Sequence, residues 1–172
     1  MKSLHKKELK EILIKNWMTH DGMWFFHCVK NCGIQKANKI NKAAVKSMAK
    51  IELKRLKKAF NIGKIEKFKD LQNFLNKIFN VVKAKFMDFT YEFPSNNELN
   101  FIMNKCFAYD GVRRMGIINQ YKCGIFDRLE GWFEELGIKY SITPQIDGCM
   151  MYKNGECFRN FRFYFNEGTN VN

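Results

Sequence analysis

Four cysteines in the second half of the chain have the residue type and the placement of a metal site. Cys106, Cys123, Cys149 and Cys157 are expected where predicted strands, a helix and a turn begin or end. Element ends often converge to form a tetrahedral zinc site, and zinc prefers deprotonated thiols as ligands. The spacing contains no Cys-x-x-Cys pair, so the residues alone also fit four buried cysteines that act as small apolar side chains.

A second group of aromatic and titratable residues repeats at helical spacing near the amino terminus, which puts its members on one helix face. Such a face is typical of a pocket wall, with His20 as general acid or base and Asp21 orienting a ligand. The same pattern also fits an aromatic core face with polar groups at its edge. The group consists of Trp17, His20, Asp21, Trp24, His27 and Cys28.

Charged residues in two other segments are candidates to complete that pocket. Glu52 and Arg55 lie beside the apolar stripe of a predicted helix, where they are expected to pair with His20 or a ligand, or to form a boundary salt bridge. Arg113 and Arg114 could hold a ligand carboxylate through two parallel hydrogen bonds. For at least one of these two arginines, a solvent-facing turn is the preferred interpretation.

The elements that must position these residues follow from the hydrophobic periodicity, which changes from a helical period to a period of two after residue 84. The order indicates an α+β fold with a mostly antiparallel sheet. We predict one domain, residues 1–172, with a helical part (1–84) and an α+β part (85–172). The predicted order is helices over 6–31, 35–60 and 67–82, strands over 86–93 and 99–106, a polar, glycine-containing segment over 109–119, a helix over 122–136, and strands over 139–146 and 157–165.

Composition is that of a globular protein. Apolar residues make up 46% of the chain, and no run approaches the roughly 18 apolar residues of a membrane span. The first residues contain no apolar stretch, so no signal peptide is expected and we predict a cytoplasmic protein. In that compartment the six cysteines are expected to be free thiols or metal ligands. The long helices offer more apolar face than a small sheet needs, which favours a homodimer.

The net charge of +13 lies in the first half of the chain. Residues 1–86 carry 21 Lys or Arg and 6 Asp or Glu, whereas residues 87–172 carry 9 and 11. A basic half can indicate nucleic-acid binding. The lysines are scattered around the predicted helices, and no nucleic-acid motif accompanies them, so a solvated helix surface is the preferred interpretation.

The segment from Cys123 to Gly137, followed by Asp147-Gly-Cys149 and Gly155-Glu-Cys157-Phe-Arg159, resembles the end of the 4-vinyl reductase-type domain. That family also serves as the small-molecule sensor of some transcription regulators. The resemblance implies that Cys123, Cys149 and Cys157 bind zinc. The family's carboxylate ligand has no match at Ile146. We therefore expect Cys106 as the fourth ligand, with Asp147 as the alternative, and a structural zinc.

The whole chain, including Trp17-Met-Thr-His-Asp-Gly22, also resembles uncharacterised cytosolic proteins related to L-2-amino-thiazoline-4-carboxylic acid hydrolases. The two resemblances imply a cytosolic, sensor-like protein that binds a small organic ligand beside a zinc site. The alternative is a hydrolase of a small heterocyclic amidine or amide, with His20 and Asp21 in acid–base roles. Nucleic-acid binding by the basic helices is a weaker alternative.

Overall fold

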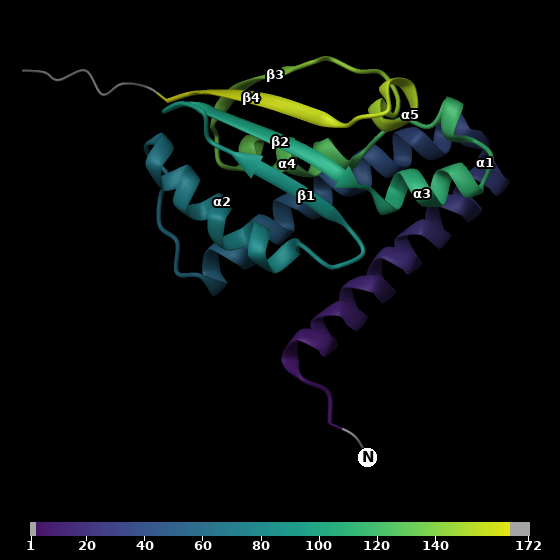
Figure 1. The fold of residues 1–172 in the computed structure, drawn as a ribbon, viewed down its shortest axis with the longest axis horizontal. Helices are drawn as coiled ribbons and strands as arrows, with labels where there is room; N and C mark the ends of the chain where they lie inside the picture. Colours follow the sequence, from purple (N-terminus) through teal and green to yellow (C-terminus); the bar gives the residue numbers. More distant parts are fainter. Residues whose placement is uncertain (1–2, 166–172) are drawn as a thin grey trace, which may run out of the picture.

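The computed structural model describes residues 3–165 and combines one long helix with a sheet and shorter helices (Figure 1). This arrangement confirms the predicted α+β class. The elements are α1 (Lys6–Ala59), α2 (Phe68–Val82), β1 (Asp88–Glu92), β2 (Glu98–Lys105), α3 (Phe107–Arg114), the 3-10 helix η1 (Ile118–Gln120), α4 (Ile125–Glu135), β3 (Lys139–Thr143), α5 (Met150–Asn154) and β4 (Phe158–Tyr164).

The sheet has the strand order β1-β2-β4-β3, and all of its neighbouring strands are antiparallel. Alternate residues of these strands point inward and are mostly aromatic, as a period of two requires. Phe101 of β2 lies 5.7 Å from Phe79 of α2, and Phe163 of β4 lies 4.8 Å from Phe133 of α4, between ring centroids. The helices α2 and α4 therefore cover the same face of the sheet.

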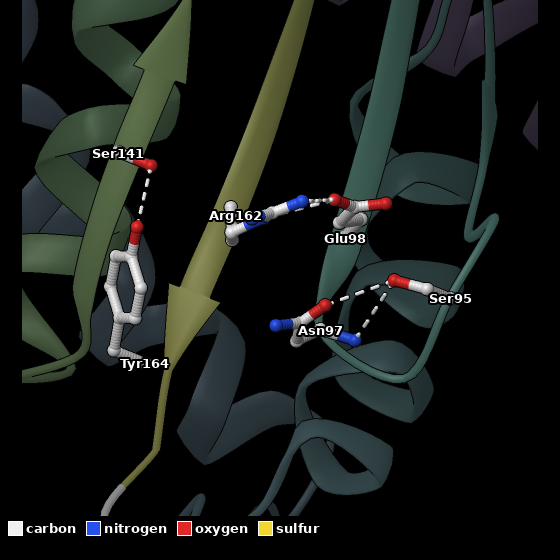
Figure 2. A network of polar contacts seen from close by, with 6 residues as sticks. All are labelled: Ser95, Asn97, Glu98, Ser141, Arg162 and Tyr164. Atoms are coloured by element: carbon white, nitrogen blue, oxygen red, sulfur yellow. Dashed lines mark hydrogen bonds and ion pairs between the residues drawn. The ribbon is translucent and has the colours of Figure 1, made fainter.

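The opposite face of the sheet is polar. Figure 2 shows Glu98 of β2 beside Arg162 of β4, a pair set by the antiparallel register of the two strands, with an Arg162 Nη2 to Glu98 Oε1 distance of 2.6 Å. The hydroxyls of Ser141 on β3 and Tyr164 on β4 lie 3.0 Å apart on the same face. Charged and hydroxyl groups at these positions show that no helix of the described chain covers this face.

The predicted helices over 6–31 and 35–60 form one 54-residue element with a break at Gly33. Gly33 has φ 76° and ψ 159°, a backbone conformation that is essentially restricted to glycine. The first half of α1 extends away from the sheet beyond this break, while the second half runs behind α4 (Figure 1). The predicted boundary at Gly33 was therefore correct, although the helix resumes directly after it.

The predicted order contained no helix in the polar, glycine-containing segment over 109–119, and this was wrong. This region contains α3, followed by η1. Cys106 caps α3 because its thiol accepts a hydrogen bond from the Tyr109 amide at 3.5 Å. The helix buries Val112 alone, so its sequence carries too short an apolar pattern to indicate a helix. Similarly, α5 occupies the predicted turn around Gly155, which ends α5 in the left-handed conformation.

The second half of α1 crosses α4 at very short range. A Cβ atom on Gly131 of α4 would lie 2.9 Å from the Cβ of Ala49 and 3.2 Å from the carbonyl oxygen of Lys46. Ion pairs flank the crossing, including Lys46 with Glu134 at 2.6 Å. Glycine at 131 therefore allows the two helices to pack more closely than any side chain would.

Replacing Gly131 with alanine should destabilise the protein, because the added methyl must push the two helices apart. The expected cost is about 1–3 kcal/mol in the free energy of unfolding, measured by urea denaturation. Gly22→Ala is the matched control, since no atom lies within 4 Å of its added Cβ. Replacing this helical glycine with alanine should instead stabilise the protein by about 0.5–1 kcal/mol. Equal stability of Gly131→Ala and the wild type would contradict the close crossing.

Candidate functional site

A cavity of about 230 Å³ lies between α1, α2, α4 and the inner face of the sheet. Its walls are formed mainly by aromatic, methionine and aliphatic side chains. Four polar residues, Asp21, Asn41, Tyr121 and Arg128, interrupt this apolar lining. Apolar walls with a few polar groups are typical of a small-molecule site. The apolar lining includes Trp17, Met48, Phe79, Phe89, Phe101, Met103 and Trp132.

Arg128 of α4 forms the most elaborate contact at this cavity. Its Nε and Nη2 atoms donate to the two carboxylate oxygens of Glu52, at 2.8 and 2.5 Å. The indole of Trp132 donates to the same carboxylate at 3.2 Å. The guanidinium also lies 5.6 Å from the ring centroid of Trp17 and 5.4 Å from that of Trp132. Both halves of α1 are thus held to α4 through one guanidinium.

Asp21 lies at the rim of the cavity and is the acidic group without a partner there. The residue is exposed as a whole, but partial burial of its carboxylate raises the pKa, against the lowering effects of His20 and Arg128. Among residues 3–165, no hydrogen bond or ion pair engages this carboxylate. Asp21 is therefore available to a ligand, whereas the charge of Arg128 is already balanced by Glu52.

Two neighbouring hollows extend the cavity. A cleft of about 460 Å³ between α1 and α3 shares Asp21, Asn41 and Tyr121 with it and adds Arg114 at its edge. A groove of about 410 Å³ runs along the first half of α1 and the end of α2, and is lined in part by Glu52 and Arg128. A ligand in the cavity therefore has room to extend toward Arg114.

Only some of the residues predicted on the helical pocket face line the cavity. Trp17 and Asp21 line the cavity. His20 and Trp24 are exposed outside it, with their rings in edge contact at 6.5 Å, and Trp24 is 63% exposed. His27 is exposed as well, and Cys28 packs in part against a small core cluster that includes Phe25.

The predicted charged residues likewise lie in different surroundings and do not form one site. Glu52 pairs with Arg128 rather than with His20, while Arg55 is exposed. Arg114 borders the outer cleft, whereas Arg113 is exposed and lies 6.0 Å from the Tyr109 ring centroid. The sequence reasoning missed Arg128, Tyr121 and Asn41. The available signal for Arg128 was a charged residue four positions before Trp132, at the edge of the apolar stripe of α4.

The four cysteines lie at the ends of elements, as predicted. Cys106 caps α3, Cys149 caps α5, Cys123 lies two residues before α4, and Cys157 directly precedes β4. Cys106, Cys149 and Cys157 are buried and Cys123 is half-buried, and all four are free thiols. The Met103 amide donates to the Cys157 carbonyl at 2.8 Å, which holds β4 beside the end of β2. The cysteines come from four separate segments of the chain.

These thiols share one neighbourhood. Burial raises the pKa of Cys106 to about 11, and the nearby Cys157 and Cys149 add to the shift. Burial likewise raises the pKa values of Cys123 and Cys157 to about 12. In both cases the neighbouring thiols act in the same direction, and the Arg159 guanidinium opposes them. We define the cysteine cluster as Cys106, Cys123, Cys149 and Cys157.

The residues of the cysteine cluster fit a zinc ion in their chemistry. Thiolates are preferred zinc ligands, and four of them complete a tetrahedral shell. Arg159, a buried cation with no carboxylate partner in the described chain, also fits a neighbour that becomes anionic. Within residues 3–165, no three His, Cys, Asp or Glu side chains are arranged as an assembled metal-binding group. Asp147, the alternative ligand, is exposed and pairs with Lys122.

Tyr121 connects the cavity with the cysteine cluster. Its side chain is buried and lines both the cavity and the outer cleft. Burial raises the pKa of its hydroxyl well above the usual value, and Cys123, Cys106 and Cys149 contribute. The next element, α4, starts two residues after Cys123 and carries the cavity residue Arg128. The same short segment therefore supplies a wall of the cavity and a member of the cluster.

Residues 2–144 match the model of a family of unknown function, DUF6125. The chain belongs to this family. The matched region spans the elements from α1 to β3, and thus both sides of the cavity and the first two cysteines of the cluster. A search of curated proteins finds no match. No helix within residues 3–165 combines the length and the apolar character that crossing a membrane requires.

Replacing Glu52 with glutamine should destabilise the protein by about 1–3 kcal/mol, because it leaves the half-buried Arg128 without its anion. The free energy of unfolding in urea measures this cost. Glu98→Gln is the matched control: it removes the same charge from a pair whose arginine is largely exposed. That change should cost no more than about 1 kcal/mol. If both variants lose the same stability, the Glu52–Arg128 pair has no special role.

Proposed function

We propose that this DUF6125 member is a cytosolic protein that binds a small, flat organic molecule in the cavity between α1, α2, α4 and the sheet. The observation that supports this function is an aromatic-walled cavity with one unpartnered carboxylate, Asp21, at its rim. A cavity of about 150 Å³ accommodates a benzene ring. The cavity, with a volume of about 230 Å³, is therefore large enough for one ring with a small substituent.

The charges around the cavity indicate the polar character of that ligand. Glu52 neutralises Arg128, so Asp21 leaves one uncompensated negative charge at the rim. A basic or strongly hydrogen-bond-donating group on the ligand would satisfy Asp21, and the Trp17 ring beside it also favours a cation. We therefore propose an aromatic or heterocyclic ligand with one basic nitrogen group.

The second part of the proposal is a structural zinc ion in the cysteine cluster. It is supported by four thiols that come from separate segments and lie near enough to affect one another's pKa values. The exposure of Asp147 favours Cys106 as the fourth ligand. Bound zinc would tie the starts of α3, α4, α5 and β4 together. With four thiolate ligands the ion has no open coordination position, so its contribution is to the fold around the cavity.

A hydrolase of a small heterocyclic amidine or amide is the second candidate. The raised pKa of Asp21, at the rim of a cavity, favours it, because acid–base groups in active sites often have such shifts. His20 lies next to Asp21 in the sequence but is exposed outside the cavity. Asp21 is therefore the proposed acid–base residue of this alternative, with His20 as a modulator of its charge.

The expected homodimer and the nucleic-acid alternative are supported by surface features outside the cavity. The first half of α1 leaves the apolar side chains of Leu9, Leu13, Met23 and Trp24 exposed, which supports a homodimer through this half of the helix. Nucleic-acid binding by the basic helices has weaker support than the homodimer. Lys42, Lys46 and Lys54 of α1 are engaged with acidic residues of α4 rather than free on the surface.

Benzamidine is a suitable probe of the proposed ligand site, because it combines one aromatic ring with a cationic amidine. It should shift the NMR signals of the Trp17 and Trp132 indoles and leave the exposed Trp24 unchanged. Asp21→Asn should weaken its binding roughly 10-fold through the lost charge-assisted hydrogen bond. Benzoate, the anion of similar shape, should bind more weakly than benzamidine.

The mouth of the cavity provides a matched pair of controls. Ala44→Phe should block binding, because Ala44 lines the cavity, whereas the neighbouring exposed Ala43→Phe should leave it intact. If Asp21→Asn and Ala44→Phe both bind benzamidine with the affinity of the wild type, the proposed site is refuted. Turnover of L-2-amino-thiazoline-4-carboxylate that is lost in Asp21→Asn would establish the hydrolase instead.

Protein purified without chelators should contain about one zinc ion per chain by elemental analysis. Cys123→Ser and Cys157→Ser should lose the metal and lower the melting temperature by several degrees, since binding of a structural metal adds to folding stability. Cys32→Ser is the control outside the cluster, because serine can keep the hydrogen bond that Cys32 donates to the Cys28 carbonyl. Absence of stoichiometric metal in the wild type would exclude the zinc site.

A further inference from the structure

Arg159 occupies an unusual position on the inner face of β4. The other inward residues of this strand are Phe161 and Phe163, which belong to the core. Arg159 is only 6% exposed, although it carries a permanent positive charge. A buried charge is costly unless an opposite charge or sufficient hydrogen bonds compensate it. A negative charge near this position would therefore be favourable.

The partners that surround Arg159 do not supply an anion. Its Nη1 atom lies 3.2 Å from the Met150 sulfur and donates to the Phe158 carbonyl at 2.6 Å. The guanidinium lies 4.7 Å from the ring centroid of Phe126. In the part of the chain that the structure describes, no carboxylate pairs with it. Arg128, the other arginine held within the fold, has Glu52 for this purpose.

The residues that contact Arg159 direct its charge toward the cysteine cluster. Met150 directly follows Cys149, and Phe158 directly follows Cys157. Phe126 lies one helical turn after Cys123, at the start of α4. Arg159 is thus in contact with the segments that carry three of the four cysteines.

We propose that Arg159 is the counter-cation of the cysteine cluster: it compensates the negative charge that the thiols acquire when they bind a divalent metal ion. The inference rests on the proposed zinc site. Four thiols that bind one zinc ion release four protons to solvent, and the resulting centre has a net charge of −2. The Arg159 guanidinium offsets half of it. Arg159 acts through the ligands and does not touch the metal, so it is a positioning residue.

This role and a purely structural role predict opposite effects on the metal-free protein. A structural arginine stabilises the fold with or without metal, so its removal weakens both forms. A counter-cation has no anion to compensate in the metal-free form, so there its buried charge lowers the stability of the protein. Arg159→Met keeps a long apolar side chain but removes the charge. It should leave the metal-free protein at least as stable as the wild type while weakening zinc binding.

The experiment uses the full chain, stripped of metal under reducing conditions. Zinc affinity is measured by competition with a chromophoric chelator, and stability of the metal-free protein by urea unfolding. We expect Arg159→Met to bind zinc about 10–100-fold more weakly, the range typical for residues that support metal ligands. Arg159→Lys, which restores the charge, should recover most of the affinity. Arg162→Met, on the outer face of the same strand, should bind zinc as the wild type does.

Three outcomes would overturn the inference. The first is wild-type zinc affinity in Arg159→Met, and the second is a metal-free Arg159→Met protein that is unfolded or clearly less stable than the wild type. Either result, with zinc still bound by the wild type, refutes the role of Arg159 and leaves the metal site standing. The third is failure of the wild type and of Arg162→Met to bind zinc, which refutes the metal site and this inference together.

Discussion

The close crossing of α1 and α4 at Gly131 is the contact on which the arrangement of this protein depends. With no side chain at that position, the second half of α1 approaches α4 until the Ala49 methyl reaches the α4 backbone. The approach places Glu52 of α1 beside Arg128 and Trp132 of α4. It also presses α4 against the inner face of the sheet through Phe133. A wider crossing would separate these groups and disrupt the wall of the cavity.

The break at Gly33 gives the first half of α1 its separate direction, and Arg128 limits how far that half can move. The guanidinium lies against Trp17 on one side of the break and binds Glu52 on the other. Asp21 is one turn beyond Trp17, so the same contact fixes the rim of the cavity. The polar side of the cavity therefore depends on residues from both halves of one helix and on α4.

The two arginines within the fold illustrate two ways to accommodate a cation away from water. Arg128 has a carboxylate, an indole on each side and partial access to solvent, so its charge is balanced in the chain itself. Arg159 is more deeply buried and has a carbonyl, a thioether and an aromatic ring. These groups solvate the guanidinium but carry no net charge. Arg159 also connects the cysteine cluster with the rest of the core. It contacts Phe126, and Phe126 packs against Phe101 of the cavity wall.

The sequence by itself determined both halves of α1 with the break at Gly33, the helices α2 and α4, the antiparallel pairs β1–β2 and β3–β4, and the placement of the cysteines near element ends, because periodicity and glycine conformations are local properties. It did not indicate α3 or α5, which are too short to carry a helical apolar pattern. Tertiary structure alone decided which side chains meet. Glu52 and Arg128 are 76 residues apart, and no local pattern specifies their contact. His20 and Asp21 are adjacent, yet only Asp21 reaches the cavity, because neighbouring residues on a helix differ by about 100° in direction. The rotation of the first half of α1 about its axis makes that choice. The contact of Trp17 with Arg128 and the packing of Ile14 and Met18 against the core set this rotation.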